Sequence, residues 1–477
     1  MIELIRTLGG FLWDYILLFA LVGVGLYLTV LLRFPQFTRV FPAISRLIKD
    51  IKENKPAEAG RMTSFQSLAT AVAAQVGTGN IVGVASAIAA GGPGAAFWMI
   101  VSAFFGMSTI FAEAVLAQVY RKETPTGELV GGPAYYIRYG LNNVWLSYIF
   151  AVLAAIGMGI VGTMVQSNAI VTSLSESFGF PPVWATIALL VVVGVILTGG
   201  MGRIAGFSEK IVPLMAGAYI LGSLIIVFIN FRNFVPTLQI IVQSAFSPQA
   251  VGGGALGITV RETMRFGVAR GLFSNEAGLG STPHSHAVAH TDHPAEQGFI
   301  AMIGVFISTF LICTSTAMVN LMSGAYTPTI PAAEMSQQAT LMTQNAFVSG
   351  FGTFGGAFLS LSLSSFALTT IVGWYFFAES NVKMLVRNKK PLVVTFKMIF
   401  LAFIIVGPLL DPDVVWSIND LFTGLMALPN IIALIFLAKE AQWLLKDYDR
   451  QVASGKLEWP DLETQPWRRK NQKKANR

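Results

Sequence analysis

Residues 271–280 read GLFSNEAGLG, and this stretch decides the fold because polar residues and glycines interrupt an otherwise apolar segment. A second interruption, AAQVGTGN at residues 73–80, lies inside another apolar segment. Glycine loosens a helix, and a broken helix frees carbonyl and N–H groups that lipid cannot satisfy. Gly77 and Gly79 are also compatible with close helix packing. The neighbouring polar residues favour two discontinuous helices with ligands at their breaks.

The composition predicts a membrane protein built of helices. Of its 477 residues, 54% are hydrophobic and only 12% are charged, about half the charged share of a soluble protein. The apolar runs are continuous and long enough to cross a bilayer core of about 30 Å as helices, whereas a β-barrel would show short alternating segments. The first run is too long for a signal peptide and lacks a cleavage site, so we expect a retained helix.

Basic residues predict the orientation. Alternate loops on one side of the predicted spans hold 27 of the 32 lysines and arginines, and the positive-inside rule makes that side cytoplasmic. The N-terminus is then outside, and the basic C-terminal tail is cytoplasmic, close to anionic lipid rather than nucleic acid. The eleven predicted spans are 11–33, 65–90, 93–120, 146–177, 183–200, 209–230, 252–290, 295–324, 346–386, 392–410 and 414–438.

Each interruption falls in the first span of a group of five, once the N-terminal span is set aside. The two groups enter the membrane from opposite sides, which is typical of an inverted-topology repeat with its substrate site at the midplane. Broken helix ends offer N–H groups to anions and carbonyls to cations, so a zwitterion and a sodium ion fit there. The predicted parts are an N-terminal helix and basic loop, two five-helix repeats and a basic tail: 1–62, 63–232, 233–440 and 441–477.

Four motifs resemble those of the alanine/glycine:cation symporter family. They are QVGTGNI at 75–81 followed by GGPG at 91–94, GGPAYY at 131–136, RGLFSNEAGLGS at 270–281 and TIVGWY at 370–375. The sequence departs from the family at residues 375–377, which read YFF. The resemblance implies a leucine-transporter fold and sodium-coupled uptake of alanine or glycine across a bacterial inner membrane. It implies neither an enzyme nor an organic cofactor.

The resemblance also implies a set of substrate-binding residues. Backbone N–H groups of Thr78, Gly79 and Asn80 would hold the substrate carboxylate. Carbonyls of the second interruption would hold the ammonium group and a ring there would close the pocket; the residues are Phe273, Ser274 and Asn275. Gln166 either contacts substrate or ties two helices together, since a buried amide needs partners. Trp374 either lines the substrate pocket and limits the size of the side chain, or packs against neighbouring helices.

A sodium site is predicted beside the first interruption. Phe366, Thr369 and Thr370 share one helix face, and sodium takes oxygen ligands. Two hydroxyls, the Phe366 carbonyl and the carbonyls of Ala73 and Val76 make five ligands. Alternatively, the two hydroxyls bond back to their own helix.

Other charged residues have open roles. Glu276 at the break either couples protons or bonds freed backbone, since intramembrane carboxylates are often functional. Glu113 is also near or within a span, and Glu379 is expected to be solvated or paired. Arg261, Arg265 and Arg270 are expected to face an outer vestibule or to pair with Glu262. His286 and His290 have a spacing that can chelate a metal, but capping and solvation suffice for these and for His284 and His293.

Competing classes are an intramembrane enzyme, a channel and a proton-coupled permease. Residues 278–282 do not match the serine-protease motif, and the histidine–glutamate metalloprotease motif is absent from the sequence. Two broken helices fit a channel poorly, whereas the sequence leaves sodium and proton coupling both open.

Overall fold

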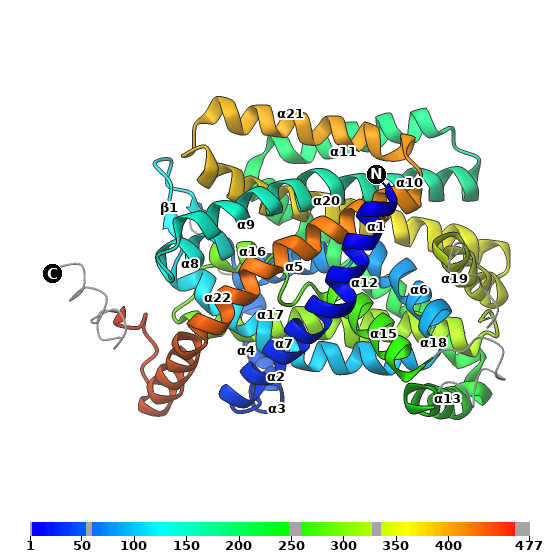
Figure 1. Cartoon of the computed structure of the whole chain (residues 1–477), viewed down its shortest axis with the longest axis horizontal. Helices are drawn as coiled ribbons and strands as arrows, with labels where there is room; N and C mark the ends of the chain where they lie inside the picture. Colours follow the sequence, from blue (N-terminus) through cyan, green and yellow to red (C-terminus); the bar gives the residue numbers. More distant parts are fainter. Residues whose placement is uncertain (1, 54–59, 248–258, 327–334, 463–477) are drawn as a thin grey trace.

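The computed structural model describes residues 2–53, 60–247, 259–326 and 335–462, and these are almost entirely helical (Figure 1). Eight helical runs in this part of the chain are long and apolar enough to cross a membrane, and a bent pair makes nine. The eight runs are Ile2–Leu31 (α1–α2), Gly94–Val119 (α7), Val144–Phe178 (α9–α10), Gly200–Ile229 (α12), Pro294–Met322 (α17–α18), Thr353–Leu385 (α20), Lys390–Leu409 (α21 with a 3₁₀ turn) and Pro412–Ser454 (α22).

Three of the long runs contain a π-helical stretch. Leu12–Leu17 separates α1 (Ile2–Phe11) from α2 (Leu18–Leu31), Gly157–Gly162 separates α9 (Val144–Ile156) from α10 (Thr163–Phe178), and Phe306–Cys313 separates α17 (Pro294–Val305) from α18 (Thr314–Met322). Such stretches are frequent at functional sites in helices.

The bent pair is the first predicted interruption. A capping box between Thr63 and Gln66 starts α5 (Ser64–Gln75). A short turn follows, and α6 (Val82–Gly91) then continues at 64° to α5. The broken helix predicted over 65–90 is therefore present.

The second interruption also breaks a helix. Thr259 and Glu262 form the capping box that starts α15 (Val260–Asn275), and Glu276 ends it in the left-handed region with φ 58°. A non-helical segment follows, and α16 (Pro283–Ala287) is only one turn long. Residues 252–258 of the predicted span lie outside the described residues.

The remaining predicted spans differ in detail from the structure. α11 (Pro182–Thr198) has 17 residues, which is at the short end of the range for a crossing helix. The predicted span 346–386 was wrong at its start, because α19 (Met335–Phe351) ends before Gly352, whose φ is +63°, and α20 begins after it. α22 continues well beyond the predicted residue 438. The count of eleven crossings stays a prediction.

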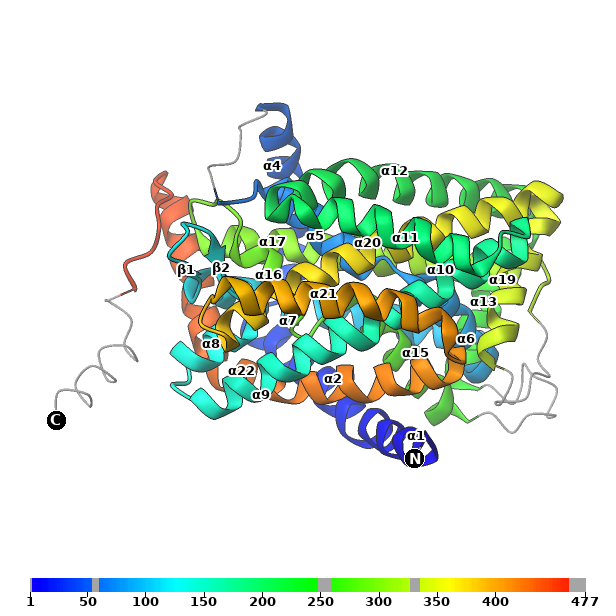
Figure 2. The same ribbon diagram turned by 90° about the horizontal axis from the view of Figure 1, so that it is seen from above.

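The helices lie side by side, and the short elements gather at the two ends of this bundle (Figure 2). At one end, which we call the basic end, lie α4, the hairpin β1–β2, α8 and the end of α22; α6, α13 and α19 lie at the opposite end. The bounds are α3 (Pro35–Thr38), α4 (Val40–Glu53), β1 (Lys122–Glu123), β2 (Leu129–Val130), α8 (Pro133–Tyr139), α12 (Gly200–Ile229) and α13 (Phe234–Phe246).

Candidate functional site

The first break releases two carbonyls from the helical hydrogen-bond ladder. The Gly77 N–H, which would bond the Ala73 carbonyl in a continuing helix, donates instead to Oδ1 of Asn80 at 3.0 Å. The Asn80 N–H donates to the Gly77 carbonyl at 3.2 Å rather than to that of Val76. The carbonyls of Ala73 and Val76 are therefore available to partners outside α5.

Thr370 of α20 meets these carbonyls. Its Oγ1 lies 3.0 Å from the Ala73 oxygen, 3.4 Å from the Val76 oxygen and 3.0 Å from the Phe366 oxygen. A hydroxyl has one proton to donate, so it cannot satisfy all these acceptors together. The residues are buried, and the cluster is a concentration of oxygen atoms that suits a hard cation.

Thr369 lies at the side of this cluster. Its hydroxyl donates to the Phe366 carbonyl at 2.9 Å and lies 3.5 Å from Sδ of Met215. Both threonine hydroxyls thus bond to a carbonyl of their own helix, which was the alternative interpretation of the sequence. The Thr370 hydroxyl also contacts the first break.

The second break releases carbonyls in the same way. The Ala277 N–H donates to Oδ1 of Asn275 at 3.0 Å, and the Gly278 N–H donates to Glu113 at 3.1 Å. The carbonyls of Phe273 and Ser274 therefore lose the donors that a continuing helix would supply. The Asn275 carbonyl differs, because Nε2 of Gln75 already donates to it at 2.9 Å.

The two breaks touch each other. The Phe273 ring packs so closely on Gly79 that a Cβ there would lie 3.0 Å from it. The buried thiol of Cys313 lies 3.0 Å from the Ser274 hydroxyl and accepts from Nδ2 of Asn80 at 3.4 Å. The two breaks therefore adjoin each other in the protein interior.

Gln166 of α10 contacts the first break. Its Nε2 donates to the Thr78 hydroxyl at 3.2 Å, and its Oε1 accepts a long bond of 3.4 Å from the Thr78 N–H. The side chain ties α10 to the break. A carboxylate is a stronger acceptor for the same N–H.

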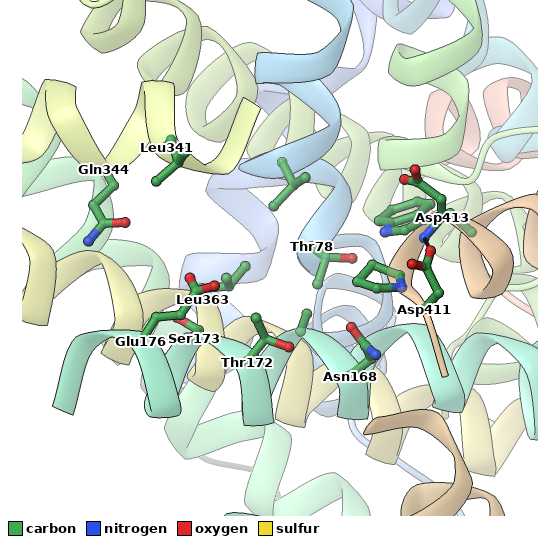
Figure 3. Close-up of a pocket in the computed structure, with 14 residues that line it drawn as sticks. Thr78, Asn168, Thr172, Ser173, Glu176, Leu341, Gln344, Leu363, Asp411 and Asp413 are labelled. Carbon is green, nitrogen blue, oxygen red and sulfur yellow. Dashed lines mark hydrogen bonds between the residues drawn. The ribbon is translucent and has the colours of Figure 1, made fainter. Parts of the chain in front are cut away.

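A cavity of about 570 Å³ leads to this region. Thr78 lies at its centre in the close-up view, with Asn168 and Asp411 beside it and Gln344 farther away (Figure 3). Its lining comes from α6, α10, α19, α20 and the start of α22. These segments lie toward the end of the bundle opposite the basic end (Figure 2).

Trp374 is not part of the cavity lining. Its ring packs against Gly162 so closely that a Cβ there would overlap the ring, and its Nε1 donates to Glu276 at 2.6 Å. Ser281 donates to the other oxygen of Glu276 at 2.5 Å. Trp416, which no motif in the sequence marks, lines the cavity instead. The sequence around a single aromatic residue in an apolar run does not indicate whether its ring lines a cavity or packs against other helices.

The other charged residues have specific partners. Glu113 is buried and accepts from Gly278 and from Asn430, whose amide also donates to the Gly278 carbonyl at 2.9 Å. Glu379 pairs with Lys383 at 3.6 Å, as expected.

The arginines of α15 do not pair as the sequence suggested, because Glu262 caps the helix with Thr259. Arg265 pairs with Asp14 and Arg270 with Asp420, while the Arg261 guanidinium lies 5.2 Å from the centre of the Tyr15 ring.

The histidines do not share a helix face. α16 ends at Ala287, so His290 lies beyond it and contacts Arg61 at 3.1 Å. His286 faces Ser67 and Gln297. The described residues contain no group of three potential histidine, cysteine or carboxylate metal ligands.

Comparison with known proteins identifies the family of this chain. The model of the sodium:alanine symporter family matches residues 1–461. The chain belongs to this family. It is 36% identical to the sodium/alanine symporter AgcS of Methanococcus maripaludis, over 92% of this chain and 95% of that protein. It is 38% identical to the probable sodium/glutamine symporter GlnT of Bacillus subtilis, over 95% of this chain and 92% of that protein.

The fold is that of a solved membrane transporter. A manganese transporter of Eremococcus coleocola matches with a TM-score of 0.53 over 80% of this chain and 84% of its own, at 13% identity. That likeness concerns the fold alone. The family makes this chain a multi-pass membrane transporter rather than an enzyme.

Proposed function

We propose that this symporter couples an inward sodium gradient to uptake of a small neutral amino acid, alanine or glycine, by alternating access. The observation that carries the proposal is the convergence of the Ala73, Val76 and Phe366 carbonyls on the Thr370 hydroxyl. These four oxygens, with the Thr369 hydroxyl beside Phe366, would replace the water shell of a sodium ion.

The substrate would lie where the breaks meet. Its carboxylate would accept from the N–H groups of Thr78, Gly79 and Asn80 and from the Gln166 amide. Its ammonium group would bind the carbonyls released at the second break, for which the structure favours Phe273 and Ser274. The Asn275 carbonyl would join them only if the Gln75 amide moved away.

The fold supports a specific membrane arrangement. We propose eleven crossings: an extra N-terminal helix, then repeats over 63–232 and 233–440. The two broken helices, α5–α6 and α15–α16, would each open a repeat. With the basic end cytoplasmic, the N-terminus is outside, the cavity opens outward, and the tail after 441 lies near lipid at the inner membrane. Its last basic residues, 468–477, lie outside the described residues.

Uptake by purified protein in liposomes tests the function. We expect accumulation of labelled alanine only with an inward sodium gradient, and weak competition by leucine and phenylalanine. Glutamine should also be tested as a competitor, because one relative is named a probable sodium/glutamine symporter. If leucine displaced alanine as well as unlabelled alanine does, the small-substrate proposal would be wrong.

Proton coupling is the alternative function. It is favoured by Glu276, a buried carboxyl whose donors, Ser281 and Trp374, are neutral. The same liposomes, with choline in place of sodium and an imposed pH gradient, separate the two. Equal uptake under that gradient would replace sodium by protons as the coupling ion.

A further inference from the structure

Asn80 shapes the first break, and the helix run α17–α18 holds it from two sides. Its Oδ1 accepts from the Gly77 N–H at 3.0 Å, so this N–H is not available to the Ala73 carbonyl. Its side-chain amide donates to the Ser308 carbonyl at 3.1 Å, in the π-helical stretch. Its own carbonyl accepts from the Thr316 hydroxyl of α18 at 2.9 Å. A change in the position of Asn80 would therefore alter the break itself.

The Thr316 hydroxyl has two carbonyls within reach. It lies 2.9 Å from that of Asn80 and 3.0 Å from that of Ile312, four residues earlier in the same helical run. A hydroxyl has one proton to donate, and a threonine inside a helix commonly bonds the carbonyl four residues before it. A contact from outside α18 can therefore decide whether Thr316 holds Asn80.

Tyr219 of α12 supplies such a contact. Its hydroxyl lies 2.7 Å from Oγ1 of Thr316, and both side chains are fully buried. Of the two possible directions of this bond, only donation by Tyr219 leaves the Thr316 proton for a carbonyl. Hydrogen bonds in such a chain polarise one another. The Tyr219 hydroxyl thus orients Thr316 and, through it, Asn80.

The same face of α12 lies behind the proposed sodium site. The Tyr219 ring centre lies 5.2 Å from that of Phe366, at an interplanar angle of 61°, which is an edge-to-face contact that aromatic pairs prefer. Met215 precedes Tyr219 by four residues and shares its helix face, and its Sδ lies 3.5 Å from the Thr369 hydroxyl. α12 therefore supports the residues of α20 whose oxygens face the first break.

We propose that Tyr219 is a positioning residue for transport, whose hydroxyl sets Asn80 through Thr316 and whose ring sets Phe366. This inference rests on the proposed function. Without the hydroxyl, Thr316 would turn to the Ile312 carbonyl and release that of Asn80. The N–H groups proposed for the substrate carboxylate and the carbonyls proposed for sodium would then both be less well placed.

The test measures the sodium and alanine dependence of uptake into liposomes. Tyr219→Phe removes the hydroxyl and keeps the ring. We expect the concentrations of sodium and of alanine for half-maximal uptake each to rise about two- to tenfold, the effect of one neutral hydrogen bond. The maximal rate should stay close to that of the wild type. The matched control is Tyr27→Phe, because Tyr27 is 41% exposed.

Variants of Thr316 test the connection from Tyr219 to Asn80. Thr316→Val should shift both constants at least as far as Tyr219→Phe does, whereas Thr316→Ser keeps the hydroxyl and should stay close to the wild type. The double variant Tyr219→Phe/Thr316→Val should match Thr316→Val alone, because two groups that act through one connection are not additive. Shifts that multiply in the double variant would overturn this connection.

The outcomes separate the inference from the function. Unchanged constants in Tyr219→Phe, or a lower maximal rate with unchanged constants, overturn the positioning role while the symporter stands. If Tyr219→Phe or Thr316→Val does not fold, the other decides, because unchanged constants in either contradict the connection. No sodium-dependent alanine uptake by the wild type would instead refute the proposed function.

Discussion

Removal of the Thr370 hydroxyl is the most direct test of the ion site. Thr370→Ala deletes the one oxygen that lies within 3.4 Å of the Ala73, Val76 and Phe366 carbonyls. A hydrogen-bond-sized contact to a charged group contributes about 1.5–3 kcal/mol. At 1.4 kcal/mol per decade, the sodium concentration for half-maximal uptake should rise roughly tenfold to a hundredfold.

The same variant should weaken alanine binding at limiting sodium, because coupled binding sites affect each other reciprocally. Saturating sodium should restore much of the apparent alanine affinity, whereas general damage to the substrate site would persist. Thr370→Ser keeps the oxygen and should stay close to the wild type. Thr369→Ala should have a smaller effect, because its hydroxyl meets only the Phe366 carbonyl among these oxygens.

The assay is alanine uptake into liposomes over a sodium series, at matched reconstitution. Thr395→Ala is the control, since that exposed hydroxyl bonds to the Pro391 carbonyl of its own helix, at 3.1 Å. A sodium dependence of Thr370→Ala equal to that of the control would refute the reasoning and remove α20 from the ion site. The family assignment would be unaffected.

Three further variants test other contacts. Gly77→Ala places a Cβ 2.5 Å from Oγ1 of Thr370, so sodium affinity in uptake assays should fall at least tenfold while the protein stays folded; an unchanged affinity would contradict the cluster. Glu276→Gln leaves Ser281 or Trp374 without an acceptor and should destabilise the protein by about 1–3 kcal/mol, seen as a lower melting temperature in detergent. Burial lowers the pKa of His293 to about 4. Burying the neutral ring therefore contributes to the stability of the folded protein above about pH 6.5, the pKa of an unfolded histidine, and this contribution is lost as the pH falls toward 4. His293→Asn should make the melting temperature depend less on pH between these values, and an unchanged slope would contradict this.

Both breaks were predictable from the sequence, because glycines and polar residues inside an apolar run free backbone groups that lipid cannot satisfy. The contact of Thr370 with the first break was also predictable, since spacing places its hydroxyl on the face shared with Phe366; its role as a sodium ligand stays a prediction. The bond from Gln75 to the Asn275 carbonyl was not predictable, because that contact depends on how α5 packs against α15. The helix start at Thr353 was missed because the apolar run continues across Gly352.

The choice between tryptophans shows where sequence reasoning ends. Trp374 lies inside a recognised motif and Trp416 does not, yet only Trp416 lines the cavity. Both are bulky residues in apolar segments, and their roles depend on a glycine and a carboxylate from distant parts of the chain.

One helix joins the two halves of the site. Thr370 and Trp374 are four residues apart on α20 and share a face; Thr370 contacts the carbonyls of the first break and Trp374 donates to Glu276 of the second. Between them, Gly373 lies so close to α5 that a Cβ would be 3.3 Å from Ala74. An ion bound between the first break and Thr370 would therefore also affect the position of α20, and α20 contacts the second break through Trp374. This shared contact is a physical route by which sodium binding would raise the affinity for an amino acid held between the breaks.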